Sequence, residues 1–134
     1  MFITRPRSTP HRPGFTLIEM LIVVVIIGIL AAVAIPKFAT TTAKADLANV
    51  RSDLHNLATA EEGYYAEYSG YTASLALLGM QVSQGVIVTI VQATPQGYSA
   101  MAVHPAAVPV TCAVYYGQVT PLAPATSEGV ITCQ

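Results

Sequence analysis

The stretch Gly14-Phe15-Thr16-Leu17-Ile18-Glu19 leads into an apolar segment, Met20 to Ile35, that contains no charged residue. The 21 residues from Phe15 to Ile35 would extend about 31 Å as a helix and match the hydrocarbon core of a bilayer. An ionised carboxylate near the bilayer centre costs on the order of 3 kcal/mol by insertion scales. The sequence therefore predicts a membrane helix in which Glu19 has a partner and a role.

A cut after Gly14 would supply that partner. Phe15 would then begin the chain with a cationic amine, which Glu19 of one subunit can neutralise on a neighbouring subunit. The string closely resembles the signature of the type IV pilin and pseudopilin family, a short basic leader followed by Gly-Phe-Thr-Leu-Ile-Glu and an apolar helix. The resemblance implies that a membrane-embedded prepilin peptidase cleaves between Gly14 and Phe15 and methylates the amine of Phe15. It also implies that Phe15 and Glu19 guide subunit assembly.

The chain is expected to divide into three segments. Residues 1–14 form a basic leader that is removed, and its three arginines hold it in the cytoplasm and send the carboxyl end outward. Residues 15–36 form a hydrophobic helix for the membrane or the filament core. Residues 37–134 form a globular domain that includes the amphipathic part of the helix.

An ordinary secretory signal is the competing interpretation of the amino terminus. A basic region, an apolar region and the small residues Ala32-Val33-Ala34 fit that pattern, and Ile35 would then begin a secreted binding module. The length of the apolar run and the helical pattern that continues past Ala34 favour one continuous helix instead.

Beyond Pro36, apolar positions advance by alternate steps of three and four residues, which predicts an amphipathic helix. The helix is expected to run from Phe15 to about Glu67. Proline removes a backbone hydrogen bond and glycine lowers helix propensity, so a flexible, kinked or melted stretch is expected between Gly28 and Pro36. The periodic positions are Ala43, Leu47, Val50, Leu54, Leu57, Glu61, Tyr64 and Tyr68.

The acids of this helix are interpreted as facing solvent or neighbouring subunits, because adjacent acids on a helix usually form a solvated face. The tyrosines near its end are interpreted as packing between helix and sheet rather than as an adhesive or electron-hopping surface. The acids are Asp46, Asp53, Glu61, Glu62 and Glu67, and the tyrosines are Tyr64, Tyr65, Tyr68 and Tyr71.

Short apolar segments separated by turn residues follow Ser69-Gly70 and predict an antiparallel sheet. Its apolar face is expected to cover Leu47, Leu54 and Leu57 of the helix. The fold class is therefore α+β, a long amino-terminal helix packed on a small antiparallel sheet, and this layout resembles the pilin fold. The expected elements are a helical turn over 74–78 stopped by Gly79, strands over 86–91, 98–103, 110–116 and 130–133, and a turn at Pro95-Gln96-Gly97.

Composition excludes several classes of function. The chain has 134 residues, 53% of them hydrophobic and 10% charged, which fits one compact domain plus a membrane segment rather than a disordered protein. Residues 15–134 hold three bases (Lys37, Lys44, Arg51) against seven acids, so there is no basic stripe for nucleic acid. Phosphate-loop motifs are absent as well, and the energy for assembly must come from another protein.

Cysteine and histidine give no catalytic or metal-binding pattern. Cys112 and Cys133 are expected to form a disulfide, because both lie in the part predicted to be exported. They lack the further ligands that a metal site needs, and no cofactor is expected. His55 and His104 have no nucleophile beside them in the sequence and are interpreted as structural or solvated. Calcium, which related secretion pseudopilins hold with several acids, is not expected because only Glu128 lies in the carboxyl-terminal loops.

The resemblance thus implies a structural subunit of a type IV pilus-like filament and not an enzyme. Expected partners are copies of the same chain, the prepilin peptidase, an assembly platform with its ATPase, and the bacterial inner membrane before export to an extracellular pilus. A type II secretion pseudopilin in a periplasmic pseudopilus, or a minor pilin, is the alternative within the family. A secreted module after cleavage at Ala34 is the alternative outside it, and an extracytoplasmic enzyme that depends on His55 or His104 is the third hypothesis.

Overall fold

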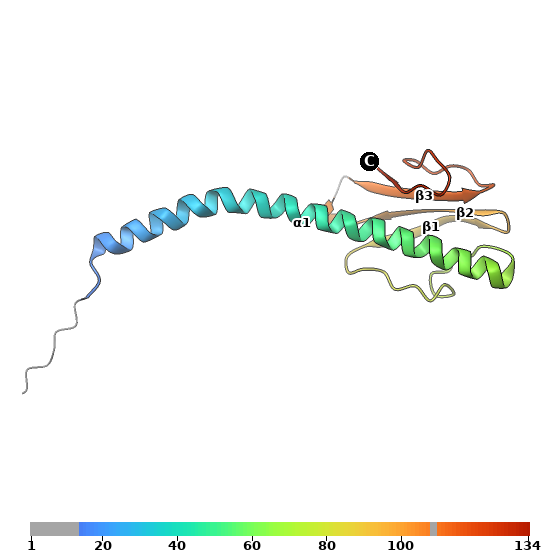
Figure 1. The fold of residues 1–134 in the computed structure, drawn as a ribbon, viewed down its shortest axis with the longest axis horizontal. Coiled ribbons are helices and arrows are strands. Elements are labelled where there is room, and N and C mark those ends of the chain that lie inside the picture. Colours follow the sequence, from blue (N-terminus) through green and yellow to red (C-terminus); the bar gives the residue numbers. More distant parts are fainter. Residues whose placement is uncertain (1–13, 108–109) are drawn as a thin grey trace, which may run out of the picture. The chain divides into compact units, whose positions relative to one another are not determined.

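A computed structural model describes residues 14–107 and 110–134, so the arginines of the expected leader, Arg5, Arg7 and Arg12, lie outside the described residues. The chain divides into a first unit that ends at Phe38 and a second that runs from Ala39 to Gln134. Figure 1 shows the elements of both, coloured along the sequence.

One helix, α1, runs from Leu17 to Tyr68 and confirms the predicted long helix to within two residues at either end. It continues without interruption through Gly28 and Pro36, and flexibility at these two residues stays a prediction. Ser69, the residue after the helix, adopts a φ of 54°, the left-handed conformation in which many helices end.

The first half of α1 is long and apolar enough to cross a membrane. Its most apolar window of 18 residues has a mean hydropathy of 3.0, and none of that window is buried. This statement rests on the length and the composition of the helix. A signal sequence near an amino terminus shares both properties.

Four antiparallel strands follow α1 and pair in the order β1-β2-β3-β4. The first three lie within one to three residues of the predicted bounds, and β1 extends three residues further because a bulge between Ile90 and Gln92 shifts its register and lets pairing resume. The fourth is shorter than predicted, since only the last two residues of 130–133 form a strand. A short 3-10 helix, η1, precedes β3. The bounds are β1 Ile87–Thr94, β2 Gly97–Val103, η1 Pro105–Ala107, β3 Thr111–Gly117 and β4 Thr132–Cys133.

The hairpin between β1 and β2 has a two-residue loop, Pro95-Gln96, at the predicted turn. Glycine is required where this turn meets the end of β3. A Cβ atom on Gly97 would collide with the carbonyl oxygen of Tyr116. A Cβ atom on Gly117 would likewise collide with the carbonyl oxygen of Gln96, and Gly117 has a φ of 73°, which favours glycine.

The core of the second unit lies between α1 and one face of the sheet (Figure 1). Leu54 and Leu57 are completely buried and Leu47 is half-buried, which confirms the predicted contact face of the helix. Alternate residues of the strands point into this core, as the two-residue period of a strand requires. The buried core residues are Val50, Leu54, Leu57, Val86, Val88, Tyr98, Ala100, Ala102, Cys112 and Val114.

The predicted disulfide between Cys112 and Cys133 is present. It joins directly opposed residues of β3 and β4, and the two backbone hydrogen bonds between Thr111 and Gln134 continue this pairing to the chain end. The last strand is therefore attached covalently to the sheet.

The segment after α1 forms the predicted turn but not a helix. The backbone N–H of Leu78 donates to the carbonyl of Ser74, Thr72 Oγ1 accepts from the N–H of Ser74, and Gly79 ends the turn with a φ of 60°. One turn of this kind does not satisfy the definition of a helix, because too few consecutive hydrogen bonds form.

Candidate functional site

The first turn of α1 contains a reciprocal pair of side-chain hydrogen bonds. The backbone N–H and the hydroxyl of Thr16 both donate to Glu19 Oε2, at 2.8 and 2.7 Å, and the N–H of Glu19 donates to Thr16 Oγ1 at 3.3 Å. This is a capping box, in which the side chains at the N-cap and three residues later satisfy each other's backbone donors.

Glu19 therefore has a partner within its own chain. The expectation of a partner on another subunit did not include Thr16. The spacing Thr16-x-x-Glu19 before an apolar run is itself the sequence signature of a capping box, so the signal was present. Both bonds that the carboxylate accepts end on Oε2, and the Glu19 residue is exposed.

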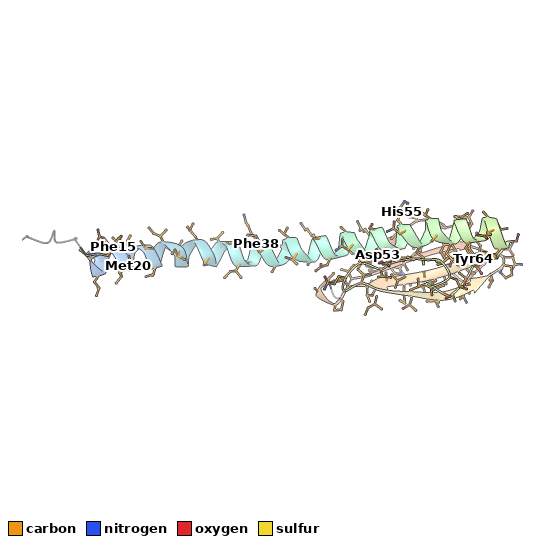
Figure 2. The ribbon with its side chains drawn as sticks, turned by 90° about the horizontal axis from the view of Figure 1, so that it is seen from below. Phe15, Met20, Phe38, Asp53, His55 and Tyr64 are labelled. Carbon is orange, nitrogen blue, oxygen red and sulfur yellow. A yellow bond between two sulfur atoms is a disulfide. The ribbon has the colours of Figure 1, made fainter. Side chains whose placement is uncertain are left out.

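Gly14 and Phe15, the predicted cleavage pair, lie just before the helix. Phe15 is 76% exposed, and a Cβ atom on Gly14 would meet no other atom within 4 Å. Figure 2 shows Phe15 and Met20 at the start of the helix, with side chains projecting away from it. The peptide bond between Gly14 and Phe15 is accessible, and cleavage there stays a prediction.

Large apolar side chains are exposed on every side of the first unit. A helix that is apolar all round needs either lipid or other helices to cover it, because soluble monomers rarely expose contiguous apolar patches of this size. The exposed residues are Leu17, Ile18, Met20, Leu21, Ile22, Val23, Val24, Val25, Ile26, Ile27, Ile29, Leu30, Val33, Ile35 and Phe38.

The two histidines of the described residues differ in their surroundings. His55 is exposed on the side of α1 opposite the strands (Figure 2). His104 Nδ1 accepts a hydrogen bond from the N–H of Ala106 at 3.1 Å and lies 3.7 Å from a carboxylate oxygen of Asp46. Neither contact of His104 includes a nucleophile, and no group of three possible metal ligands occurs among residues 14–107 and 110–134.

Two acids predicted to face solvent are buried, so that prediction was wrong for Asp53 and Glu61. Asp53 is 2% exposed, lies on the side of α1 that faces the strands (Figure 2), and accepts from the N–H and hydroxyl of Ser83 at 2.8 and 3.0 Å. Glu61 is completely buried and accepts from the N–H of Thr72 at 3.1 Å. Both carboxylates fasten the segment between α1 and β1 to the helix.

The tyrosines pack only partly as predicted. Tyr71 lies between helix and sheet, with ring centroids 5.0 Å from Tyr65 and 5.1 Å from Tyr98. Tyr64 and Tyr68 stack on each other at 4.5 Å, but Tyr68 is 61% exposed. Burial raises the pKa of Tyr71 to about 12, because its phenolate would lie in a poorly solvated place near Glu62.

Replacing Asp53 by alanine is expected to lower the free energy of unfolding of the second unit by about 2 kcal/mol, since the N–H and hydroxyl of Ser83 lose their acceptor. Thermal unfolding of the detergent-solubilised chain, followed by circular dichroism, measures the change. Asp46→Ala is the matched control and should cost less than about 1 kcal/mol, because Asp46 makes only a long ion pair with His104. Equal losses in the two variants would contradict the assigned role of Asp53.

Comparison with known proteins finds a motif family and several relatives that resemble parts of this chain. Residues 10–35 match the family model described as the prokaryotic N-terminal methylation motif. The chain is 38% identical over 95 residues to the type IV wide pilus major component PilA4 of Thermus thermophilus, a match that covers 68% of this chain and 72% of the relative. Over 79 residues it is 39% identical to the type IV major pilin protein PilA of Myxococcus xanthus, covering 59% of this chain.

A fimbrial protein of Pseudomonas aeruginosa is 50% identical over 54 residues, which is 40% of this chain. The matches to the Myxococcus and Pseudomonas proteins span 36% and 35% of those relatives, about a third of their length.

Proposed function

Since the chain belongs to the type IV pilin family, we propose that it is a structural subunit that polymerises through its amino-terminal helix into a pilus-like filament. The observation that supports this proposal best is the first unit, a helix with exposed apolar side chains on every side and one carboxylate in its first turn. Lipid can cover such a helix before assembly, and the same helices of other subunits can cover it afterwards.

The proposed maturation begins with cleavage between Gly14 and Phe15. The match to the methylation motif includes this bond, which supports cleavage by a prepilin peptidase followed by methylation of the Phe15 amine. An assembly platform with its ATPase then supplies the energy for moving the subunit from the inner membrane into an extracellular filament.

The capping box gives Glu19 two roles in this process. Within the subunit, Oε2 caps the helix through Thr16. Oε1 remains available to accept from the Phe15 amine of a neighbouring subunit, so a copy that docks in the wrong register leaves both charges unpaired. At about 4 Å such a pair is worth roughly 4 kcal/mol at an effective dielectric constant of about 20, before the cost of desolvation is subtracted.

The alternatives have less support. Cleavage after Ala34 would divide α1, which is continuous from Leu17 to Tyr68. A calcium-bound pseudopilin would need several free acids near the carboxyl end, whereas Glu128 there already accepts a hydrogen bond from the N–H of Gly117 at 2.7 Å.

Replacing Glu19 by alanine is expected to abolish filaments while cleavage continues, because the charge that selects the register is lost. Mass spectrometry of the mature amino terminus should find N-methyl-Phe15 in both the unsubstituted chain and the variant, and electron microscopy should find filaments only with the unsubstituted chain.

Glu19→Gln is the matched control for helix capping, because glutamine also serves at the third position of a capping box. It should lose filaments as Glu19→Ala does. Normal filaments from cleaved Glu19→Ala would refute the role in register. Normal filaments from Glu19→Gln alone would assign the effect to capping instead of charge.

A further inference from the structure

A groove lies on the second unit where the end of α1 passes the turn that follows it. It has a volume of about 300 Å³ and is lined by Gly63, Tyr64, Glu67 and Tyr68 of the helix and by Leu77 and Leu78 of the turn, together with Ala60. The helical residues recur at intervals of three and four, so they form one stripe along the helix. Gly63 leaves the groove open, because a Cβ atom there would meet nothing within 4 Å.

The lining combines features that suit a cationic side chain. Tyr64 and Tyr68 both line the groove and stack with centroids 4.5 Å apart, and an ammonium group is attracted to aromatic rings. The Glu67 carboxylate lies close enough to Tyr68 to raise the pKa of that phenol. Leu77 is 65% exposed and can cover the methylene stem of a long side chain.

The chain itself offers few cations that could enter this groove. In the second unit the only lysine or arginine residues are Lys44 and Arg51, and Arg51 Nε already donates to Cys133 Sγ at 3.2 Å. Lys44 is exposed and takes part in no ion pair within the described residues of that unit.

Lys44 cannot reach the groove of its own molecule. At about 100° per residue, the advance from Lys44 to Tyr64 brings the two residues to opposite sides of α1, and the rise of about 1.5 Å per residue separates them by about 30 Å along its axis. Lys44 of one molecule can therefore enter only the groove of a second copy. Such a head-to-tail contact is heterologous, and it produces an open helical array when its rotation does not close a ring.

We propose that the groove between Tyr64, Tyr68 and Leu77 is an intersubunit contact that receives Lys44 of a second copy, with Glu67 as the counter-ion. This inference rests on the proposed filament function and adds to it a specific contact between the globular parts of two subunits. It fixes an axial displacement of about 30 to 35 Å between the two copies that touch.

Cysteine cross-linking in assembled filaments tests this contact. The chain that carries both Lys44→Cys and Glu67→Cys should form a ladder of disulfide-linked oligomers when filaments are oxidised and separated without reducing agent. The native cysteines do not interfere, because they are paired with each other. The matched control carries Lys44→Cys and His55→Cys, two exposed positions on the same side of α1, and should give about tenfold less cross-linked product, the factor that a difference of about 1.4 kcal/mol in contact free energy produces.

A charge exchange provides a second measurement. Lys44→Glu should reduce the amount of filament, Lys44→Arg should preserve it, and Glu67→Lys added to Lys44→Glu should restore it. Filaments that form normally but yield only monomers from the Lys44→Cys, Glu67→Cys chain would overturn the contact and leave the filament function intact. Failure of the unsubstituted chain to form filaments under assembly conditions would overturn the filament function itself, and the contact with it.

Discussion

Replacing Glu61 by glutamine is expected to raise the free energy of unfolding by about 2 kcal/mol near neutral pH, with little change near pH 4. Glu61 is completely buried, Oε2 accepts one hydrogen bond from Thr72, and Oε1 has no hydrogen-bond partner among the described residues. The aromatic groups around it are Tyr98 of β2 and Tyr71, and neither can neutralise a carboxylate. In the part of the chain that the structure describes, an ionised Glu61 is therefore a buried charge with no cation paired to it.

Burial raises the pKa of Glu61 above its ordinary value of 4.5, and the hydrogen bond from Thr72 only partly opposes this shift. In the pH range between 4.5 and the raised pKa, the folded chain binds more protons than the unfolded chain, so stability falls as pH increases. The contribution of Glu61 to the free energy of unfolding is therefore fully present below pH 4.5. It is lost as the pH rises through the pKa that Glu61 has in the folded chain. Glutamine does not ionise and should remove the decline.

Chemical unfolding of the detergent-solubilised chain over a series of pH values, followed by the near-ultraviolet signal of the tyrosines, measures this difference. Tyr71 and Tyr98 stay protonated over this range because burial raises both pKa values. Glu62→Gln is the matched control, since Glu62 is the adjacent but exposed acid, and it should leave the pH profile unchanged. Identical profiles for the Glu61→Gln variant and the parent would contradict the buried-charge explanation.

Glu61 also shows where sequence patterns conflict. The spacing of three and four residues placed it on the apolar stripe between Leu57 and Tyr64, whereas its charge and its neighbour Glu62 favoured a solvated face. The spacing correctly predicted that Glu61 lies on the buried side of α1, because helical geometry fixes which side of the helix a residue occupies. The prediction from residue type was wrong because the segment after the helix folds back and its Thr72 N–H donates to the Glu61 carboxylate. Donor and acceptor are 11 residues apart in sequence, and no local pattern encodes that pairing.

Asp53 was misassigned for the same reason, since its donor Ser83 lies 30 residues away. By contrast, the extent of α1, the positions of the strands and the disulfide could be predicted, because period, turn residues and cysteine chemistry are local or compositional signals. The strand order and the groove beside Tyr64 could not, because both depend on how distant segments pack. Gly14, Phe15 and Glu19 were proposed from a contiguous motif, which also contains the signal for the capping role of Thr16.

Removing the disulfide with Cys112→Ala and Cys133→Ser is expected to lower the free energy of unfolding of the second unit by about 3 kcal/mol. The bond closes a loop with a sequence separation of 21 residues, and without it the unfolded chain gains conformational freedom. The strand β4 has only two residues, so its pairing with β3 has little other support. Arg51 also loses the sulfur atom that accepts from its Nε.

The expected result is a lower midpoint of thermal unfolding and earlier exchange of the amides of residues 130–134 than in the rest of the sheet. Treatment of the unsubstituted chain with a reducing agent should reproduce both changes, which separates the loss of the bond from the effect of the new side chains. The control variant is Ala125→Ser, a buried substitution of similar size away from the bond, and it should preserve the protection of β4. If residues 130–134 remain protected in the reduced chain, the backbone hydrogen bonds between Thr111 and Gln134 are sufficient to hold the carboxyl end, and the disulfide acts only on the unfolded state.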